Sequence, residues 1–343
     1  MIRKIFFWPL LVILLVSGLA GCTKPVVDHQ QVANNEKIVI KFSHVTAENS
    51  PKGLAAERFA NLVRKRTGGY VEVQVFPNST LYTDGEEIDA LQKGNVQMIA
   101  PATSKLSAMF PEWQLLDLPF AFPDLQSVHT FMDGPIGRQM LAQLQTKNML
   151  GLAMWNSGFK EMTNNKRPLI KPSDFQMLRF RIMPSQVLQD QFELLGASTD
   201  SMPFNDVGNA LTTGQVDGEE NTISNIYTQE FDQSQKYLTL SDHGYLGYVV
   251  LTNADFWHSL PPSIRKILED TLAEVTQWER LEAEEVNKRQ LADLEKQGDL
   301  QIHRLTPSEK QAWQQALAPV YNRLAERIGA GPVNSVKEIT SSP

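Results

Sequence analysis

The stretch from Leu178 to Tyr227, LRFRIMPSQVLQDQFELLGASTDSMPFNDVGNALTTGQVDGEENTISNIY, decides the fold because it alternates strand and helix patterns. Residues 178–183 alternate apolar and basic side chains, which is typical of a strand. Two helical patterns follow, over 185–195 and 205–213, and a glycine closes each of them; a strand near residue 200 lies between. This alternation predicts an α/β domain.

A candidate anion site lies in the same stretch. Arg179 and Arg181 point the same way if residues 178–183 form a strand. Further on, Asp217 to Asn221 combines turn formers and acids with a polar amide, which favours a loop at the edge of a pocket. Because a guanidinium binds a carboxylate through two parallel hydrogen bonds, Arg181 is the candidate that fixes an anion. The alternative is an ion pair between Arg181 and Glu219 or Glu220.

The composition is that of a globular protein with an acidic balance of charge. The 343 residues are 42% hydrophobic and 21% charged, which allows two domains with a buried core. The formal net charge is -7 and no run of basic residues occurs, which argues against binding to nucleic acid. A pocket with a few convergent cations is compatible with this charge, because local geometry sets the binding of a small anion.

The N-terminus has the pattern of an export signal. Basic residues precede an apolar run from Ile5 to Val16, and Leu19-Ala20-Gly21-Cys22 follows. The apolar run is too short to span a bilayer. We therefore predict a signal peptide over residues 1–21 and a protein in the periplasm or on the outer face of the cytoplasmic membrane.

Cys22 is the only cysteine of the chain, so an internal disulfide is excluded. Leu19 to Cys22 resembles the lipobox of bacterial lipoproteins, in which the cysteine becomes the lipidated first residue and anchors the protein to the membrane. Residues 22–37 lack periodicity and are rich in polar amides and valine, which predicts a flexible tether. The alternative is an ordinary signal peptide cut nearby, which also exports the protein.

Residues 38–100 alternate strands and helices as well. Strands are predicted at 38–43, 71–75 and 96–100, with a helix capped by Ser50 after the first strand and a short helix after the second. Two crossovers of this kind build a parallel sheet, and ligands bind beyond the carboxyl ends of its strands. Those ends are His44 to Lys52, the Pro77-Asn78 turn and Thr103-Ser104-Lys105.

The remainder of the chain contains longer elements. Residues 111–124 are aromatic and interrupted by prolines, which predicts a packed irregular loop rather than a helix. Residues 261–297 have a helical pattern roughly 54 Å long, which favours a strut across both domains over a coiled coil. The capping box Thr306-Pro307-Ser308-Glu309 starts a final helix that runs to about Ile328. Further strands are predicted at 149–155, 158–163, 237–240 and 245–252.

No catalytic motif occurs in the sequence. It has no Gly-x-Ser-x-Gly, no second cysteine and no pair of histidines at metal-ligand spacing, so we expect neither an enzyme nor a bound cofactor or metal. Asp217, Glu219 and Glu220 are an alternative as a calcium cluster, although their spacing is not that of an EF-hand. His44 and His243 each lie at the end of a predicted strand, where an imidazole can donate a hydrogen bond to a ligand.

Several motifs occur in a characteristic order. They are LRFRI at 178–182, MPF at 202–204, ALTTGQVDGEENTISNIY at 210–227, SDHGYLGY at 241–248 and DFW at 255–257, preceded by FSHV at 42–45 and LPF at 118–120. Together they resemble the dicarboxylate-binding branch of the DctP-type solute-binding proteins of TRAP (tripartite ATP-independent periplasmic) transporters. The resemblance covers about residues 38–330.

The resemblance implies a fold and a function. The fold is a two-domain periplasmic-binding-protein clamshell of the α/β class, crossed by strands and a long helix. Such a protein binds a small carboxylate between its domains and delivers it to a TRAP membrane permease, and we expect a monomer. Domain I would comprise 38–157 and about 249–285, domain II would comprise 158–248 and about 286–330, and 331–343 would form a C-terminal tail.

The resemblance also implies residue roles. The carboxylate-fixing arginine of the family matches Arg181, its partner asparagine matches Asn221, and the aromatic residue that packs against the ligand matches Phe204. Lys160 matches a second cation, and a lysine there resembles the branch that takes four-carbon dicarboxylates such as malate, succinate and fumarate. The other candidate ligand-binding residues are His44, Ser104, Trp155, Asn225 and His243.

Two positions depart from the family's pattern. Many relatives have Gln where this chain has Glu219, and Tyr where it has Gly208. A Glu219 facing the pocket would repel a carboxylate, whereas a Glu219 outside it would pair with a surface base. The departures leave a sugar acid or another carboxylate open as the ligand. A clamshell sensor domain that presents its ligand to a membrane kinase is the alternative to transport.

Overall fold

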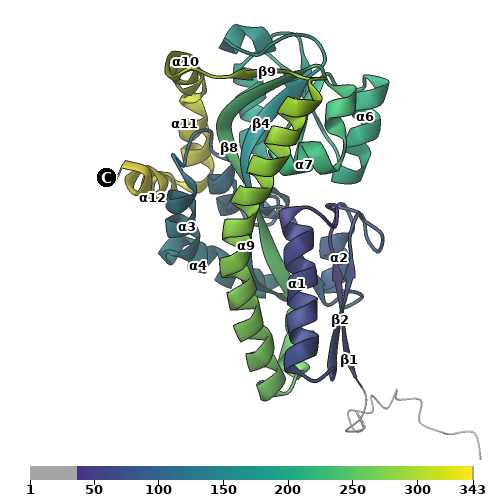
Figure 1. The fold of residues 1–343 in the computed structure, drawn as a ribbon. Helices are drawn as coiled ribbons and strands as arrows, with labels where there is room; N and C mark the ends of the chain where they lie inside the picture. The colour runs from purple at the N-terminus through teal and green to yellow at the C-terminus, as the bar shows by residue number, and fades with distance from the viewer. Residues whose placement is uncertain (1–36, 342–343) are drawn as a thin grey trace, which may run out of the picture. The chain divides into compact units, whose positions relative to one another are not determined.

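A mixed sheet of nine strands runs through residues 37–341, the part of the chain that the computed structural model describes (Figure 1). The predicted signal peptide and most of the predicted tether, with Cys22, lie outside these residues. The order of the strands is β2-β1-β3-β8-β4-β7-β5-β6, and β9 pairs with β8. The strands are β1 Ile38–Ser43, β2 Val71–Phe76, β3 Met98–Ile99, β4 Met149–Asn164, β5 Arg179–Ile182, β6 Ser198–Ser201, β7 Gly218–Asn221, β8 Tyr237–Asn253 and β9 Gln301–Arg304.

The sheet contains two parallel groups of three strands with the same order. In the first group β1 lies between β2 and β3, and in the second β5 lies between β6 and β7; all four pairings are parallel. Each group therefore has the order second, first, third along the chain. This confirms the predicted parallel sheet in residues 38–100 and the repeat of its strand and helix pattern after residue 178.

Two long antiparallel strands join the groups. β4 has 16 residues and β8 has 17, and they pair with each other along most of their length. The register shifts between Asn156 and Gly158, where Gly158 has a φ of 131°, but β4 is continuous where we predicted the two strands 149–155 and 158–163. We predicted two strands over 237–252, but β8 is continuous. Where its register with β4 shifts again, the Glu161 side chain accepts hydrogen bonds from the backbone N–H groups of Ser241 and Asp242, at 2.5 and 3.1 Å.

Helices cover both groups of strands (Figure 1). The α-helices of the described range are α1 Pro51–Arg66, α2 Glu87–Gln92, α3 Leu125–Asp133, α4 Pro135–Gln143, α5 Gln186–Leu194, α6 Val207–Thr213, α7 Ile223–Thr228, α8 Ala254–Ser259, α9 Pro262–Gln297, α10 Pro307–Leu317, α11 Pro319–Ile328 and α12 Ala330–Ser341.

Helix α9 contacts elements of both groups, as the strut prediction requires. Near its start, Thr271 accepts a hydrogen bond from Arg66 of α1 at 2.9 Å. Near its end, Asn287 accepts one from the backbone N–H of Ser224 in α7, also at 2.9 Å. Figure 1 shows α9 running beside α1 and on towards α7. A single helix thus reaches from the first group to the second.

The predicted helix starts are confirmed, but one predicted helix is broken. Ser50 caps α1 by accepting from the N–H of Gly53 at 3.1 Å, and the Thr306 capping box with Glu309 starts α10. The single helix that we predicted up to residue 328 is two helices, because α10 ends at Leu317 and Pro319 begins α11. Proline has no backbone N–H to continue the hydrogen-bond ladder of the preceding helix.

Two more segments differ from their predicted form. Residues 111–117 form a 3-10 helix, where we predicted an irregular loop, and Trp113 is fully buried in it. The prolines around it rule out a long α-helix but not one or two tight turns. Helix α12 occupies the predicted C-terminal tail, and its Val333 and Val336 are buried in the main core.

The close approach of β7 to its neighbours generates a stability prediction. A Cβ at Gly218 would lie 2.1 Å from the carbonyl oxygen of Thr163 in β4 and 2.8 Å from the Phe180 ring in β5. Gly218→Ala should therefore lower the free energy of unfolding, measured by urea denaturation, by about 1–3 kcal/mol. In the control Gly331→Ala, where nothing lies within 4 Å of the added carbon, the free energy should not fall. Equal effects of the two substitutions would contradict the tight packing of β7.

Candidate functional site

A narrow cavity lies where the two parallel groups of strands face each other. All but two of its lining residues lie at the carboxyl ends of parallel strands or in the segments that follow them, and the other two belong to β8. Ligands bind at this edge in open α/β sheets. The lining residues are Val45, Thr46, Asp84, Ala102, Lys105, Arg181, Met183, Phe204, Asn221, Asn225, Leu246 and Tyr248.

Arg181 is a buried cation without a carboxylate partner. Its side chain is 2% exposed, and its Nε and Nη2 both donate to the carbonyl oxygen of Met202, at 3.3 and 3.1 Å. Within residues 37–341 no carboxylate lies within 4.0 Å of it, and its Nη1 makes no hydrogen bond. The alternative of an ion pair with Glu219 or Glu220 is therefore wrong. Burial lowers the pKa of Arg181, although nearby acids oppose this effect.

Phe204, Asn221 and Asn225 lie beside Arg181, as predicted. The Phe204 ring centre is 5.9 Å from the guanidinium carbon of Arg181, which suits a cation–π contact. Asn225 donates from Nδ2 to the Oδ1 of Asn221 at 2.8 Å and to the hydroxyl of Tyr248 at 3.1 Å. The Oδ1 of Asn225 is buried and has no partner in the described part of the chain. The cavity therefore combines one unneutralised guanidinium with an aromatic wall and amide groups.

Residues 218–221 are a buried strand and not the predicted loop. Every residue of β7 is buried, because the strand lies between β4 and β5. Glu219 is fully buried, accepting from Asn221 Nδ2 at 3.0 Å and from Thr163 Oγ1 at 3.2 Å, so it does not pair with a surface base. Burial raises the pKa of Glu219 to about 7, although the hydrogen bonds from Asn221 and Thr163 and the charge of Arg181 oppose it.

Lys160 and His243 do not line the cavity. The Nζ of Lys160 lies 2.6 Å from Oε1 of Glu220, and Nε2 of His243 lies 2.8 Å from Oε2 of the same carboxylate; all three side chains are buried. Burial raises the pKa of Glu220, but Lys160 and His243 outweigh it and lower the pKa to about 2. The charge of Lys160 is thus neutralised inside the protein.

His44, Ser104 and Trp155 are buried next to the cavity but outside its lining. Ser104 donates to Asp117 at 2.6 Å, and Nε1 of Trp155 donates to Thr276 at 3.0 Å. Burial lowers the pKa of His44 to about 3, so its imidazole is neutral, and its buried Nε2 has no partner among the described residues. Of these three side chains, only His44 keeps an unused polar atom near the cavity.

Asp84, Lys105 and Tyr248 line the cavity without having been predicted as ligand-binding residues. Lys105 belongs to a segment that we placed at a strand end, so the topology pointed to its region but not to its side chain. Asp84 is in the connection between β2 and α2, where no pattern marks it. Burial raises the pKa of Tyr248 to about 12, so its hydroxyl stays protonated and donates to Ser157 at 3.2 Å.

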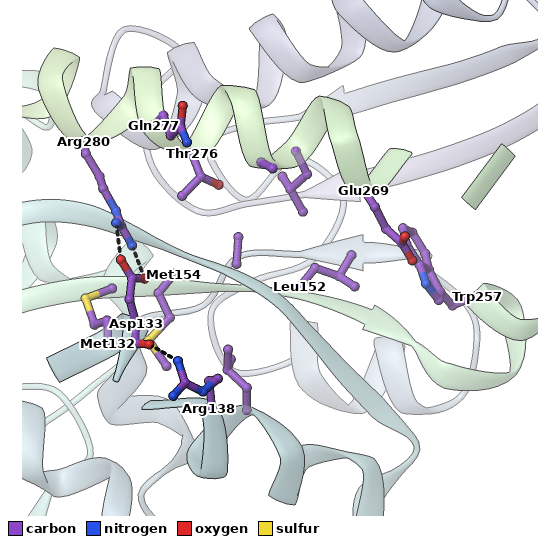
Figure 2. Close-up of a pocket in the computed structure, with 14 residues that line it drawn as sticks. Met132, Asp133, Arg138, Leu152, Met154, Trp257, Glu269, Thr276, Gln277 and Arg280 are labelled. Atoms are coloured by element: carbon purple, nitrogen blue, oxygen red, sulfur yellow. Dashed lines mark hydrogen bonds and ion pairs between the residues drawn. The ribbon is translucent and has the colours of Figure 1, made fainter. Parts of the chain in front are cut away.

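A second hollow lies elsewhere, between α3, α4, β4 and α9 (Figure 2). It is larger than the Arg181 cavity. Figure 2 shows that both of its arginines are tied to Asp133: Arg280 binds the carboxylate at 2.7 and 2.8 Å, and Arg138 donates to the backbone carbonyl. Its cations are therefore not free to take an anion, and size alone does not make it the ligand site.

The described residues also bear on the calcium alternative. Within residues 37–341, no group of three or more His, Cys, Asp or Glu side chains is arranged to hold a metal ion. Glu219 and Glu220 are neighbours in β7, but Glu220 is committed to Lys160 and His243.

Comparison with known proteins agrees with this geometry. The family model DctP, described as bacterial extracellular solute-binding protein, family 7, matches residues 42–328. The chain belongs to the DctP family.

Two similar proteins carry names or ligands that bear on the cavity of this DctP-family chain. The C4-dicarboxylate-binding protein DctB of Bacillus subtilis (strain 168) is 46% identical over 93% of this chain and 91% of its own length. A TRAP periplasmic solute-binding protein from Sulfurospirillum deleyianum, solved with bound succinate, is 40% identical to this chain. Its TM-score is 0.86, and the match covers 89% of this chain and 99% of that protein.

A third DctP-family relative binds a different acid. The sugar acid binding protein DctPAm from Advenella mimigardefordensis, in complex with galactonate, is 30% identical and also has a TM-score of 0.86, over 89% of this chain and 98% of its own. The fold of this chain is therefore equally similar to a succinate complex and to a galactonate complex, so the fold alone does not distinguish the two ligands.

The departures noted in the sequence have defined places in this DctP-family chain. Gly208 lies in α6 and is not part of the cavity lining; a Cβ there would meet only Phe231, at an ordinary 3.7 Å.

Among the described residues, no helix is long and apolar enough to cross a membrane.

The buried Glu219 generates a prediction on stability and pH. Its pKa is about 7 in the folded chain and near the ordinary 4.5 when unfolded, so the folded state binds the extra proton and loses stability as the pH rises from 4.5 to 7. Glu219→Gln lacks this loss. Relative to the parent, the variant should gain up to about 3 kcal/mol in free energy of unfolding over this interval, measured on ligand-free protein by urea denaturation.

The exposed Glu295→Gln serves as a control for the removal of one carboxyl group. A constant difference between Glu219→Gln and the parent from pH 4.5 to pH 7 would show that Glu219 is not buried as a neutral acid.

Proposed function

We propose that this chain is a solute-binding protein that captures a four-carbon dicarboxylate, such as succinate, malate or fumarate, outside the cytoplasm and delivers it to a TRAP permease. The observation that carries the proposal is the buried guanidinium of Arg181, which faces a cavity without a carboxylate partner. A buried charge is costly unless it is paired, and a guanidinium fork matches a carboxylate. A ligand carboxylate supplies the missing partner.

The relatives favour a dicarboxylate over other acids. The B. subtilis relative is named for C4-dicarboxylates and the S. deleyianum structure contains succinate, and both are more similar to this chain than the galactonate-binding protein is. A sugar acid is the second candidate, because the cavity also offers amide groups that bind hydroxyls. A thermal-shift panel of succinate, malate, fumarate and galactonate separates the two.

The ligand would bind between two moving parts. We assign domain I to 38–157 with about 249–285 and domain II to 158–248 with about 286–330, and the register shift at residues 156–158 of β4 supports a hinge there. Arg181 and Phe204 belong to domain II, and Thr46 and Lys105 to domain I. A ligand that contacts both sides stabilises the closed state relative to the open one.

The role also includes a place in the cell and a mode of action. Export by residues 1–21, lipidation of Cys22 and a tether over 22–37 would keep a monomeric protein near the permease. Binding without turnover follows from the role, and unchanged ligand recovered after incubation tests it. A permease gene beside this one favours transport, whereas a membrane kinase gene favours the sensor alternative.

The identity of the ligand can be measured directly. Mass spectrometry of the small molecules released from the purified, denatured protein should detect a four-carbon dicarboxylate. Release of a sugar acid instead would overturn the choice of ligand but not the carboxylate clamp.

The clamp itself predicts a difference between two neighbouring arginines. Arg181→Lys keeps a cation but loses the guanidinium fork, so it should weaken succinate binding at least about 100-fold in calorimetry. Arg179 lies two residues away on the same strand and is exposed, and Arg179→Lys should leave the affinity unchanged. Parent-like affinity in the Arg181 variant would refute the assignment of the clamp.

A further inference from the structure

The Arg181 cavity contains a second cationic side chain. Lys105 lies in a short 3-10 helix, Thr103–Leu106, that follows β3 of the first parallel group. Arg181 lies in β5 of the second group. It is 10% exposed, and its Nζ lies 2.6 Å from Oδ2 of Asp84, which also lines the cavity. Arg181 and Lys105 are the cationic residues of this lining.

Lys160 differs from Lys105 in its exposure and in its position relative to the cavity. It is fully buried and does not line the cavity, and its partner Glu220 uses its second oxygen for His243. Reaching a ligand would require this lysine to break a fully buried ion pair with Glu220, which is strongly unfavourable. The Lys105–Asp84 pair already lines the cavity, so Lys105 can exchange Asp84 for a ligand carboxylate without further burial of its charge.

Asp84 holds its carboxylate between groups that could also bind the carboxylate of a ligand. Its Oδ2 accepts from Lys105 at 2.6 Å and from the backbone N–H of Phe204 at 2.9 Å. Lys105 belongs to the first parallel group and Phe204 follows β6 of the second, so one carboxylate oxygen connects both sides of the cavity. A cation on one side and a backbone N–H on the other are groups that bind a ligand carboxylate.

We propose that Lys105 binds the second carboxylate of the ligand and that Asp84 competes with the ligand for Lys105. This proposal rests on the proposed function, in which Arg181 binds the first carboxylate. A dicarboxylate bridges Arg181 and Lys105 across the cavity and displaces Asp84. A monocarboxylate reaches Arg181 alone, and the Lys105–Asp84 pair then stays closed.

Two double variants with matched loss of charge test the proposal. Lys105→Met/Asp84→Asn and Lys160→Met/Glu220→Gln each remove one cation and one carboxylate, so neither leaves an unpaired charge. The probes are succinate and its monomethyl ester, which has the same carbon chain but one carboxylate. Calorimetry gives the affinity of each probe, and melting curves without ligand show that each variant is folded.

The Lys105/Asp84 variant should lose at least about 30-fold in affinity for succinate and less than about threefold for the monomethyl ester. The Lys160/Glu220 variant should bind both probes within about threefold of the parent. The reverse pattern would overturn the proposal in favour of Lys160. Equal losses for the two probes in the Lys105/Asp84 variant would overturn it as well, because that pair would then not distinguish one carboxylate from two.

The single variant Asp84→Asn tests the competition. Asparagine keeps the shape and an acceptor for the Phe204 N–H but removes the charge that neutralises Lys105, so succinate should bind about tenfold more tightly while the monomethyl ester changes little. Weaker binding of succinate would refute competition by Asp84. If the parent protein binds neither probe, the proposed function fails, and this outcome is distinct from a failure of the roles given to Lys105 and Asp84.

Discussion

The pairing of β4 with β8 is the constraint on which the site depends. These two antiparallel strands carry the backbone from one parallel group to the other, so the carboxyl ends of both groups face a common cavity. The register of the pair shifts beside Gly158, between the two groups. Helix α9 lies beside this shift, and its Glu279 accepts a hydrogen bond from the backbone N–H of Asn156 at 3.0 Å. This backbone N–H is therefore hydrogen-bonded to a helix that contacts elements of both groups.

The buried cations named above differ in whether a carboxylate pairs with them. Lys160 is neutralised by Glu220, and Lys105 is held by Asp84. Arg181 is the cation of the cavity that lacks a carboxylate within the described residues. In the proposed function, the ligand carboxylate supplies the partner of this buried guanidinium. The folded chain bears the cost of that charge until a ligand arrives.

The structure brings some of the predicted site residues together at the cavity and leaves others, such as Lys160 and His243, outside its lining. Arg181, Phe204, Asn221 and Asn225 line the cavity because each follows or ends a parallel strand. Lys160 and His243 also lie in long strands near the cavity, yet both are bound to Glu220, more than twenty residues away from either: the separations are 60 and 23. Whether a charge is available to a ligand depends on the acid beside it in space, and sequence periodicity carries no information on that.

The sequence by itself determined the alternation of strands and helices, the parallel groups, the long helix and the caps of α1 and α10, because periodicity and capping are local properties of neighbouring residues. It also indicated, through its motifs, a carboxylate-binding family. Only the tertiary structure decided that residues 218–221 are a buried strand, that Lys160 is neutralised and that Lys105 and Asp84 reach the cavity. These facts depend on pairings between distant segments, whose register and charge partners are set when the two parallel groups pack against β4 and β8.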